Sequence, residues 1–179
     1  MIKKITPYLL VFCLTTYFSY NFTINYFPNL VYEVLHYKLQ NNQNINDNEL
    51  KYYDLPNTKS NDVVMPNPDF MYVVSFYDLS DGALNLTAKM PDSTYWSVSF
   101  YKTNTVNWYV KNDKEFNTNQ LNLVLSKQKD SYDQNMLNII ESPEEKGIMI
   151  IRILVEKKDK ESIAYYKSYQ KSVEFNKIF

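Results

Sequence analysis

The sequence predicts a mainly β protein, with an antiparallel β-sandwich or barrel between an N-terminal transmembrane helix and a C-terminal amphipathic helix. Three runs between residues 67 and 110 alternate with period two, which places successive side chains on opposite faces of a strand. Turn residues separate these runs, and short strands at close spacing are typical of an antiparallel meander. The 179-residue chain is 16% aromatic, which favours strands and leaves room for one domain with an appendage.

An apolar segment opens the chain. Lys3 and Lys4 precede residues 5–27, which contain no charged side chain and are long enough to cross a bilayer core of about 30 Å as a helix. Thr, Ser and Asn residues make the second half of this segment only marginally hydrophobic. A cleaved signal peptide is the alternative, but aromatic residues occupy the place where small residues would mark cleavage. We therefore expect an uncleaved anchor that contacts membrane lipid through residues 5–27, with the N-terminus in the cytoplasm and the remainder exported.

The sequence predicts three consecutive parts of the chain. Residues 1–27 are the cytoplasmic start and the anchor, residues 28–49 a juxtamembrane helix and an Asn- and Gln-rich linker, and residues 50–179 the exported β-domain. His36 is the only histidine and Cys13 the only cysteine. The sequence therefore predicts no disulfide within the chain and no zinc site.

The strands of the β-domain are expected where apolar residues alternate. The clearest strands are expected within residues 70–76, 84–90, 96–100, 108–110 and 121–125. Residues 147–155 are almost continuously apolar, which is typical of a strand covered on both faces. Residues 157–179 carry Ile163, Tyr166, Tyr169 and Val173 at helical spacing, which predicts an amphipathic helix docked on the sheet.

Few groups in the sequence are suited to catalysis or cofactor binding. The net charge is −1 and only two glycines are present, so neither a basic nucleic-acid surface nor a glycine-rich phosphate loop is expected. No nucleophile has a base to activate it. We expect no catalytic residues, no metal ligands and no cofactor.

A binding role is conceivable for a small set of residues, each of which also has a structural interpretation. Aspartates at turns bond to their own backbone, strand aromatics usually pack in the core, and an arginine in an apolar strand usually pairs with a carboxylate. The face that carries Tyr95 and Tyr101 with Ser97 and Ser99 mixes aromatic and small polar groups, which favours recognition. The candidate ligand-binding residues are Asp69, Tyr72, Asp78, Tyr95, Tyr101, Trp108 and Arg152.

The order of several short motifs resembles the bacterial family known as domain of unknown function 1254. The motifs are Asn67-Pro68-Asp69-Phe70-Met71-Tyr72, Tyr77-Asp78-Leu79-Ser80, Thr94-Tyr95-Trp96-Ser97-Val98, Asn104-Thr105, and Pro143 followed by residues 147–152. Ala83 departs from the family pattern, where proline is usual. The resemblance implies a jelly-roll-like β-domain in a short, membrane-anchored form, whose partner is a second β-domain, domain of unknown function 1214, on a separate chain. The family has no settled activity, so no catalytic residues follow from it.

These observations favour a single-pass protein of the bacterial inner membrane that displays a periplasmic β-sandwich as an interaction or accessory domain. The alternative is a periplasmic domain that binds a small ligand or a glycan through an aromatic face. An enzyme whose carboxylates act together with a partner chain is a third hypothesis.

Overall fold

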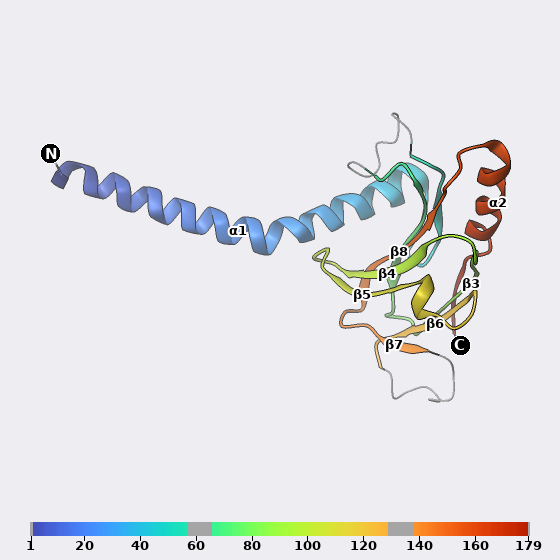
Figure 1. Cartoon of the computed structure of the whole chain (residues 1–179). Coiled ribbons are helices and arrows are strands. Elements are labelled where there is room, and N and C mark those ends of the chain that lie inside the picture. The colour runs from blue at the N-terminus through green and yellow to red at the C-terminus, as the bar shows by residue number, and fades with distance from the viewer. Residues whose placement is uncertain (1, 57–65, 129–137, 179) are drawn as a thin grey trace.

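Two β-sheets packed face to face form the body of the protein, and a long helix projects from it (Figure 1). The computed structural model describes residues 2–56, 66–128 and 138–178. The first sheet has the strand order β1-β2-β8-β4-β5 and the second has the order β7-β6-β3-β9. The predicted β-sandwich is therefore confirmed.

The strands are short, as their alternating sequences predict. The first sheet contains β1 (Lys51–Tyr53), β2 (Phe70–Asp78), β4 (Trp96–Lys102), β5 (Asn107–Asn112) and β8 (Lys146–Leu154). The second contains β3 (Leu84–Lys89), β6 (Gln120–Ser126), β7 (Ile139–Glu141) and β9 (Glu174–Lys177). A short 3-10 helix, η1 (Asp113–Glu115), follows β5.

The meander predicted from the spacing of the strands is wrong. Strands β2, β3 and β4 do not pair with one another, because β2 pairs with β8 and β3 pairs with β6 and β9. Strand β4 also pairs with β8, so the hairpin of β4 and β5 is the local pairing in this region. The turns between these strands carry the chain from one sheet to the other, and β7 lies parallel to β6.

The core lies between the sheets and takes alternate side chains from the longer strands. Trp96, Phe100 and Met149 come from the first sheet and Leu86 and Leu123 from the second, and all five are at most 1% exposed. Burial of a large apolar side chain stabilises a fold by about 1.5–3 kcal/mol. The alternation seen in the sequence therefore records which side chains face the second sheet.

Tyr77 on β2 and Gly147 on β8 are in close contact in the register of these two strands. Gly147 lies opposite Tyr77, and a Cβ on Gly147 would lie 2.4 Å from the Tyr77 hydroxyl oxygen. The Tyr77 ring is buried, and its hydroxyl group lies 3.2 Å from the Ser142 hydroxyl. The absence of a side chain at Gly147 is what gives the Tyr77 ring its place.

Helix α1 (Ile2–Gln43) is continuous through Pro7 and Pro28. Its axis changes direction about midway (Figure 1), as expected for a helix in which proline removes a backbone hydrogen bond. The last turns dock on the β-domain, where Tyr32 packs edge to face on Phe76 with ring centroids 5.2 Å apart. After the helix, Asn48 donates its backbone N–H to the Phe76 carbonyl oxygen at 2.8 Å, so hydrogen bonds hold this part of the predicted linker.

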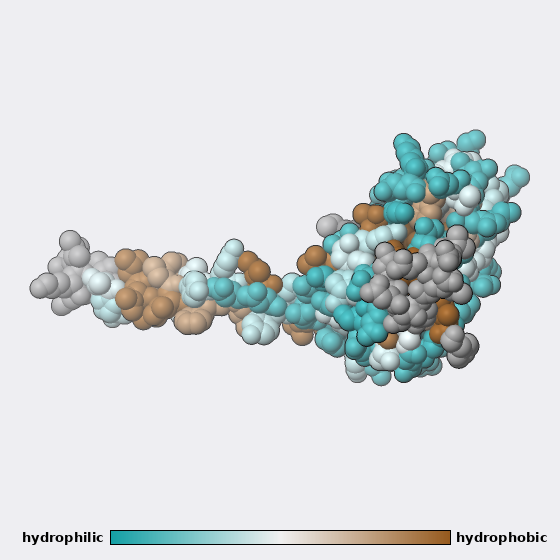
Figure 2. Space-filling view, turned by 90° about the horizontal axis from the view of Figure 1, so that it is seen from below, coloured by the Kyte–Doolittle hydropathy of each residue, from teal (hydrophilic) through white to brown (hydrophobic). Residues whose placement is uncertain are grey.

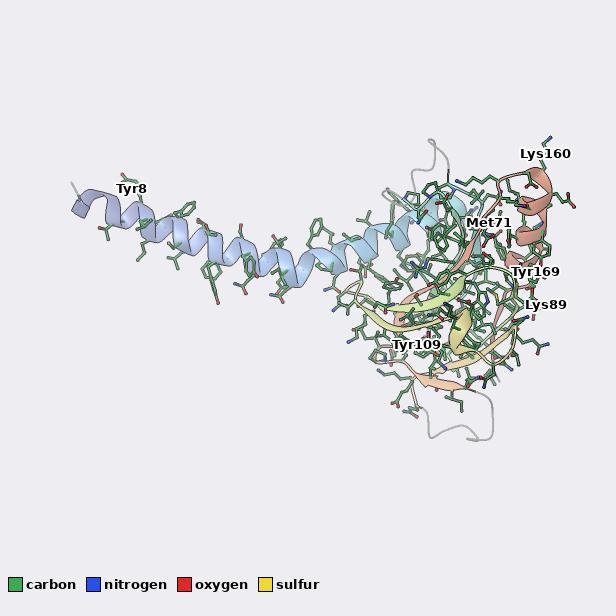
Figure 3. All side chains as sticks on the ribbon, viewed as in Figure 1. Tyr8, Met71, Lys89, Tyr109, Lys160 and Tyr169 are labelled. Atoms are coloured by element: carbon green, nitrogen blue, oxygen red, sulfur yellow. The ribbon has the colours of Figure 1, made fainter. Side chains whose placement is uncertain are left out.

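The outer half of α1 points away from the domain and exposes apolar side chains all around its axis. Tyr8 is 77% exposed and Phe12 is 66% exposed. Figure 2 shows a largely hydrophobic section on this arm, and Figure 3 shows its side chains extending away from every other described element. Among the described residues, however, no helix contains a stretch both long and apolar enough to cross a membrane. The transmembrane helix predicted over residues 5–27 is not supported, because Thr15, Thr16 and Asn21 dilute its hydrophobicity.

The C-terminal region forms a helix, α2 (Lys160–Gln170), followed by a strand. Asp159 caps α2 by accepting a hydrogen bond from the backbone N–H of Ser162 at 2.9 Å. The predicted helix continued to residue 179, but α2 ends at Gln170 and β9 pairs with β3. Val173 therefore belongs to the core beside β9 and not to the helix.

Candidate functional site

Most of the residues that could recognise a ligand lie on the outer face of the first sheet, which points away from the second sheet. Tyr72, Arg152 and Ser97 are directly opposite one another on β2, β8 and β4. Side chains in such cross-strand positions are neighbours on one face. The structure thus brings together residues that are 80 positions apart in sequence, as the register of Tyr72 with Arg152 shows.

Helix α1 covers one end of this outer face. Its last turns pack on Phe76 and Ile148, and Val74, Tyr101 and Ile150 lie against the same cluster. The rest of the outer face carries six residues that we call the Arg152 face, of which Ser99 lies at the boundary with the covered end, in register with Ile150. These are Phe70, Tyr72, Tyr95, Ser97, Ser99 and Arg152.

Arg152 is the only arginine in the sequence and lies at the centre of the Arg152 face. Its Nε–H donates a hydrogen bond to the Ser97 hydroxyl oxygen at 3.2 Å, and its guanidinium carbon lies 6.0 Å from the centroid of the Phe70 ring. No ion pair in the described part of the chain involves Arg152. In place of the carboxylate partner expected from the sequence, Arg152 has a hydrogen bond to Ser97 and a contact with the Phe70 ring, and it is partly exposed to water.

Two small residues of β4 on this face are buried. Ser97 is 0% exposed and Ser99 is 1% exposed. The Ser99 hydroxyl has no hydrogen-bond partner among the described residues. A buried polar group without a partner costs stability, so the Ser99 hydroxyl is a destabilising feature of the outer face unless another group bonds to it.

Tyr72 links the Arg152 face to the motif at residues 67–72. Its hydroxyl oxygen accepts a hydrogen bond from the Asn67 backbone N–H at 3.2 Å, and the Asn67 side chain accepts one from the Asp69 backbone N–H at 3.0 Å. Burial raises the pKa of Tyr72, and its hydrogen bond with Asn67 and the charge of Arg152 counteract part of this effect. The motif therefore shapes the entry to β2 and positions the Tyr72 ring.

The sequence-based list of candidates omits Phe70, the one aromatic member of this face that it lacks, and it also omits Ser97 and Ser99. The Phe70 ring contacts the Tyr95 ring edge to face, with centroids 6.0 Å apart. The signal was present in the sequence, because Phe70 belongs to the same alternating run as Tyr72.

The two candidate aspartates are not brought together. Asp69 precedes β2 and Asp78 ends it, so their backbones are separated by about 30 Å of extended strand. Asp69 forms an ion pair with Lys158 at 2.6 Å, and Asp78 forms one with Lys146 at 2.9 Å. This separation excludes a joint acid and base role for the two carboxylates within one chain.

The two remaining candidates have other neighbours. Trp108 packs on Phe100 at the edge of the main core, with ring centroids 5.7 Å apart. Tyr101 lies on the outer face but belongs to the end that α1 covers. Neither residue contributes to the exposed part of the Arg152 face.

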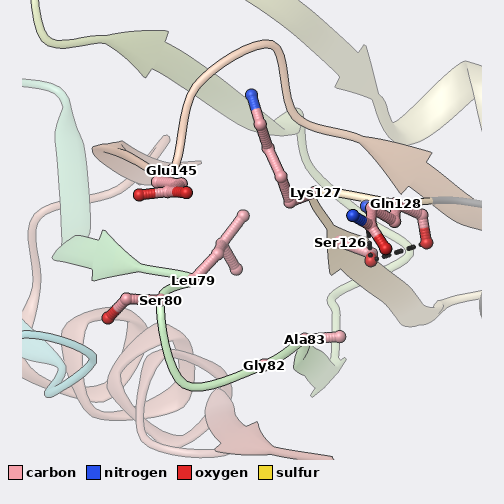
Figure 4. Close-up of a pocket in the computed structure, with 8 residues that line it drawn as sticks. All are labelled: Leu79, Ser80, Gly82, Ala83, Ser126, Lys127, Gln128 and Glu145. Atoms are coloured by element: carbon pink, nitrogen blue, oxygen red, sulfur yellow. Dashed lines mark hydrogen bonds between the residues drawn. The ribbon is translucent and has the colours of Figure 1, made fainter.

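A separate pocket of about 250 Å³ lies where the turn after β2 meets the end of β6 (Figure 4). Lys127 and Glu145 provide its charged side chains, but the Lys127 ammonium group already donates a hydrogen bond to the Pro143 carbonyl oxygen at 2.7 Å. The remaining lining is mostly small residues of the turn, such as Gly82 and Ala83. The pocket offers few groups that converge on a ligand.

The described residues contain no group of three potential metal ligands. The His36 ring packs against both the Tyr32 ring and the Phe76 ring, and the side chain contacts a carboxylate oxygen of Asp47 at 2.5 Å. This arrangement orients the imidazole ring and helps to secure the base of α1.

Comparison with known proteins assigns the chain to a family. The family described as "Protein of unknown function (DUF1254)" matches residues 48–176. The chain belongs to the DUF1254 family. The matched region contains α2 and both sheets except for the last residue of β9, and it includes every residue of the Arg152 face.

Two solved structures share the fold of this DUF1254 protein. The VPA0106 protein of Vibrio parahaemolyticus is 10% identical with a TM-score of 0.67, and the match covers 87% of this chain and 36% of that one. An uncharacterised protein of Burkholderia cenocepacia is 12% identical with a TM-score of 0.53, and the match covers 85% of this chain and 41% of that one. This chain therefore spans less than half the length of either structure. No curated protein matches it.

Proposed function

We propose that this DUF1254 domain is an accessory interaction module that helix α1 holds at a membrane surface. The observation that carries the proposal is the outer half of α1, where residues 5–27 lack charge and expose aromatic side chains on all sides. Exposure of such a surface to water is unfavourable, and aromatic side chains are suited to the interfacial region of a bilayer. Association of this kind does not require the helix to cross the bilayer.

The periplasmic face of the bacterial inner membrane is the location that we propose. A basic start followed by an apolar run, as in Lys3, Lys4 and residues 5–14, is typical of a segment that directs export. The proposed partners are membrane lipid through residues 5–27 and a separately encoded β-domain of the domain of unknown function 1214 type.

Vesicle flotation tests the membrane proposal. The full chain should float with vesicles of phosphatidylethanolamine and phosphatidylglycerol, and a Leu10→Asp/Phe12→Asp variant should remain in the dense fraction. The matched control is Tyr37→Asp/Asn41→Asp, which adds the same charge to exposed positions nearer the β-domain. Equal flotation of the two variants, or no flotation of the full chain, would overturn the proposal.

A second function is supported by a different observation, the gathering of Tyr72, Tyr95 and Arg152 on one exposed face. We infer from it that the domain binds a small ligand or a glycan there. Aromatic rings beside a directional polar group are typical of such sites. Saturable binding at the Arg152 face would support this function, whether or not α1 associates with lipid.

A further inference from the structure

We propose that the Arg152 face binds an organic carboxylate with an apolar or aromatic body, with Arg152 holding the carboxylate group. The inference builds on the second function proposed above and names its ligand class. Its basis is the combination of an arginine that forms no ion pair with a described residue and the neighbouring rings of Phe70 and Tyr95.

The first step concerns charge. The ion pairs of the described residues engage lysine or histidine with aspartate, and none engages Arg152. A half-buried cation that has no ion pair within the described part of the chain has lost part of its hydration without an electrostatic gain from those residues. An anion that arrives from outside the chain would supply that interaction.

The second step concerns orientation. The hydroxyl group of Ser97 is fully buried and holds Nε of Arg152 at 3.2 Å. Neither terminal nitrogen of the guanidinium group forms a hydrogen bond or an ion pair with a residue that the structure describes. Those nitrogens form the fork that binds the two oxygens of a carboxylate in parallel.

The third step concerns the body of the ligand. Phe70 lies beside the guanidinium group, the Tyr95 ring meets Phe70 edge to face, and Tyr72 lies opposite Arg152 on β2. Side chains with flat apolar surfaces favour an aromatic or apolar group over a strongly hydrated one. A carboxylate attached to such a body matches both parts of the face, whereas inorganic anions match only the arginine.

The experiment uses the single arginine as its reporter. In the full chain, in a non-ionic detergent, one arginine Nε–H signal is expected in an NMR spectrum of the side chains. Phenylacetate should shift that signal saturably, while the neutral isostere phenylacetamide should not. Acetate has the charge without the ring, so its affinity should be lower than that of phenylacetate by about tenfold or more.

Two variants serve as controls, and tyrosine signals report binding where the arginine is absent. Arg152→Gln should weaken phenylacetate binding by about tenfold or more, since it removes a charge-assisted pair. Lys158→Gln removes an exposed cation outside the face and should leave binding unchanged. Should Arg152→Gln fail to fold, the comparison of phenylacetate with phenylacetamide on the unmodified chain still decides the question.

The remaining outcomes separate this inference from the function on which it rests. Shifts of equal size and affinity with acetate and phenylacetate would overturn the apolar part of the proposal and indicate a bare anion contact. Binding of a neutral sugar such as methyl glucoside, without any response to phenylacetate, would overturn the carboxylate proposal but retain the ligand-binding function. No response to either compound would overturn both.

Discussion

Replacement of Gly147 by alanine is the sharpest test of the packing between β2 and β8. An added Cβ would lie 2.2 Å from the Tyr101 carbonyl oxygen, 2.4 Å from the Tyr77 hydroxyl oxygen and 2.5 Å from Cζ of Tyr77. Since real Cβ atoms keep at least 3.0 Å from such neighbours, the Tyr101 carbonyl must withdraw by about 0.8 Å. Tyr77 is 1% exposed and cannot swing into solvent.

The magnitude follows from these contacts. Overpacking of a core costs about 1–3 kcal/mol, and displacement of the Tyr77 hydroxyl from Ser142 costs about 1 kcal/mol more. We therefore expect Gly147→Ala to lower the free energy of unfolding by about 2–4 kcal/mol. That loss is a large fraction of the stability of a typical domain, about 5–15 kcal/mol.

Urea unfolding of the full chain, followed by tryptophan fluorescence, measures this loss. Gly82→Ala is the matched control, because a Cβ there meets only the Ile178 carbonyl oxygen, at 3.7 Å. Its loss of stability arises instead from backbone strain at a φ of 127° and should be about 1–3 kcal/mol. In a Tyr77→Leu background the penalty of Gly147→Ala should shrink but persist, since the Tyr101 carbonyl remains. A Gly147→Ala variant as stable as the unmodified chain would refute the described packing.

Three further predictions concern hydrogen bonds and protonation. Asn48→Ala should destabilise the domain by about 1–3 kcal/mol in thermal unfolding, because the Asn48 amide bonds both the backbone N–H and the carbonyl oxygen of Asp78, at 2.8 and 3.0 Å. Burial opposes ionisation of Asp78, but hydrogen bonds from Lys146 and Ser80 outweigh it and lower the pKa of Asp78. Ionised Asp78 should therefore stabilise the fold above about pH 4, and this contribution should disappear as the pH falls through the folded-state pKa. The difference in free energy of unfolding between Asp78→Asn and the unmodified chain should narrow over that range, and a constant difference would contradict this. Burial, with a smaller contribution from Glu115, raises the pKa of Tyr109 to about 12. In an absorbance titration Tyr109→Phe should therefore lose amplitude from the late part of the tyrosine transition, and its stability should fall less steeply than that of the unmodified chain as the pH rises above about 10.

Strand positions were predictable because half-buried strands leave a period of two in the sequence. The run that contains Phe70 and Tyr72 became β2, and the run around Leu86 became β3. The pairing of these strands was not predictable, because periodicity reports which face is buried and says nothing about which strand lies alongside. The continuation of α2 was mispredicted for a related reason: Val173 fits helical spacing, but it fills the core next to a short edge strand.

The candidate site was predicted in part. Tyr95 and Ser97 were expected on one face because they alternate with Trp96, and the structure confirms that arrangement. The position of Arg152 beside Ser97 depends on the pairing of β4 with β8, a contact between distant segments that local patterns do not encode. The distance between Asp69 and Asp78 shows the same limit, since two turn residues that look alike in sequence lie at opposite ends of one strand.

The position of β9 has a consequence for the order of events during synthesis. Strand β3 has β9 as one of its two neighbours, with Leu84 opposite Lys177, and Phe175 fills part of the core. The second sheet therefore stays incomplete until residues 174–177 have left the ribosome, although β3, the strand with which they pair, emerges much earlier. During that interval one edge of β3 is unpaired, and unpaired strand edges promote aggregation of incompletely folded chains. Pairing between such distant segments also folds slowly, so we expect this domain to depend on chaperone protection until its last strand arrives.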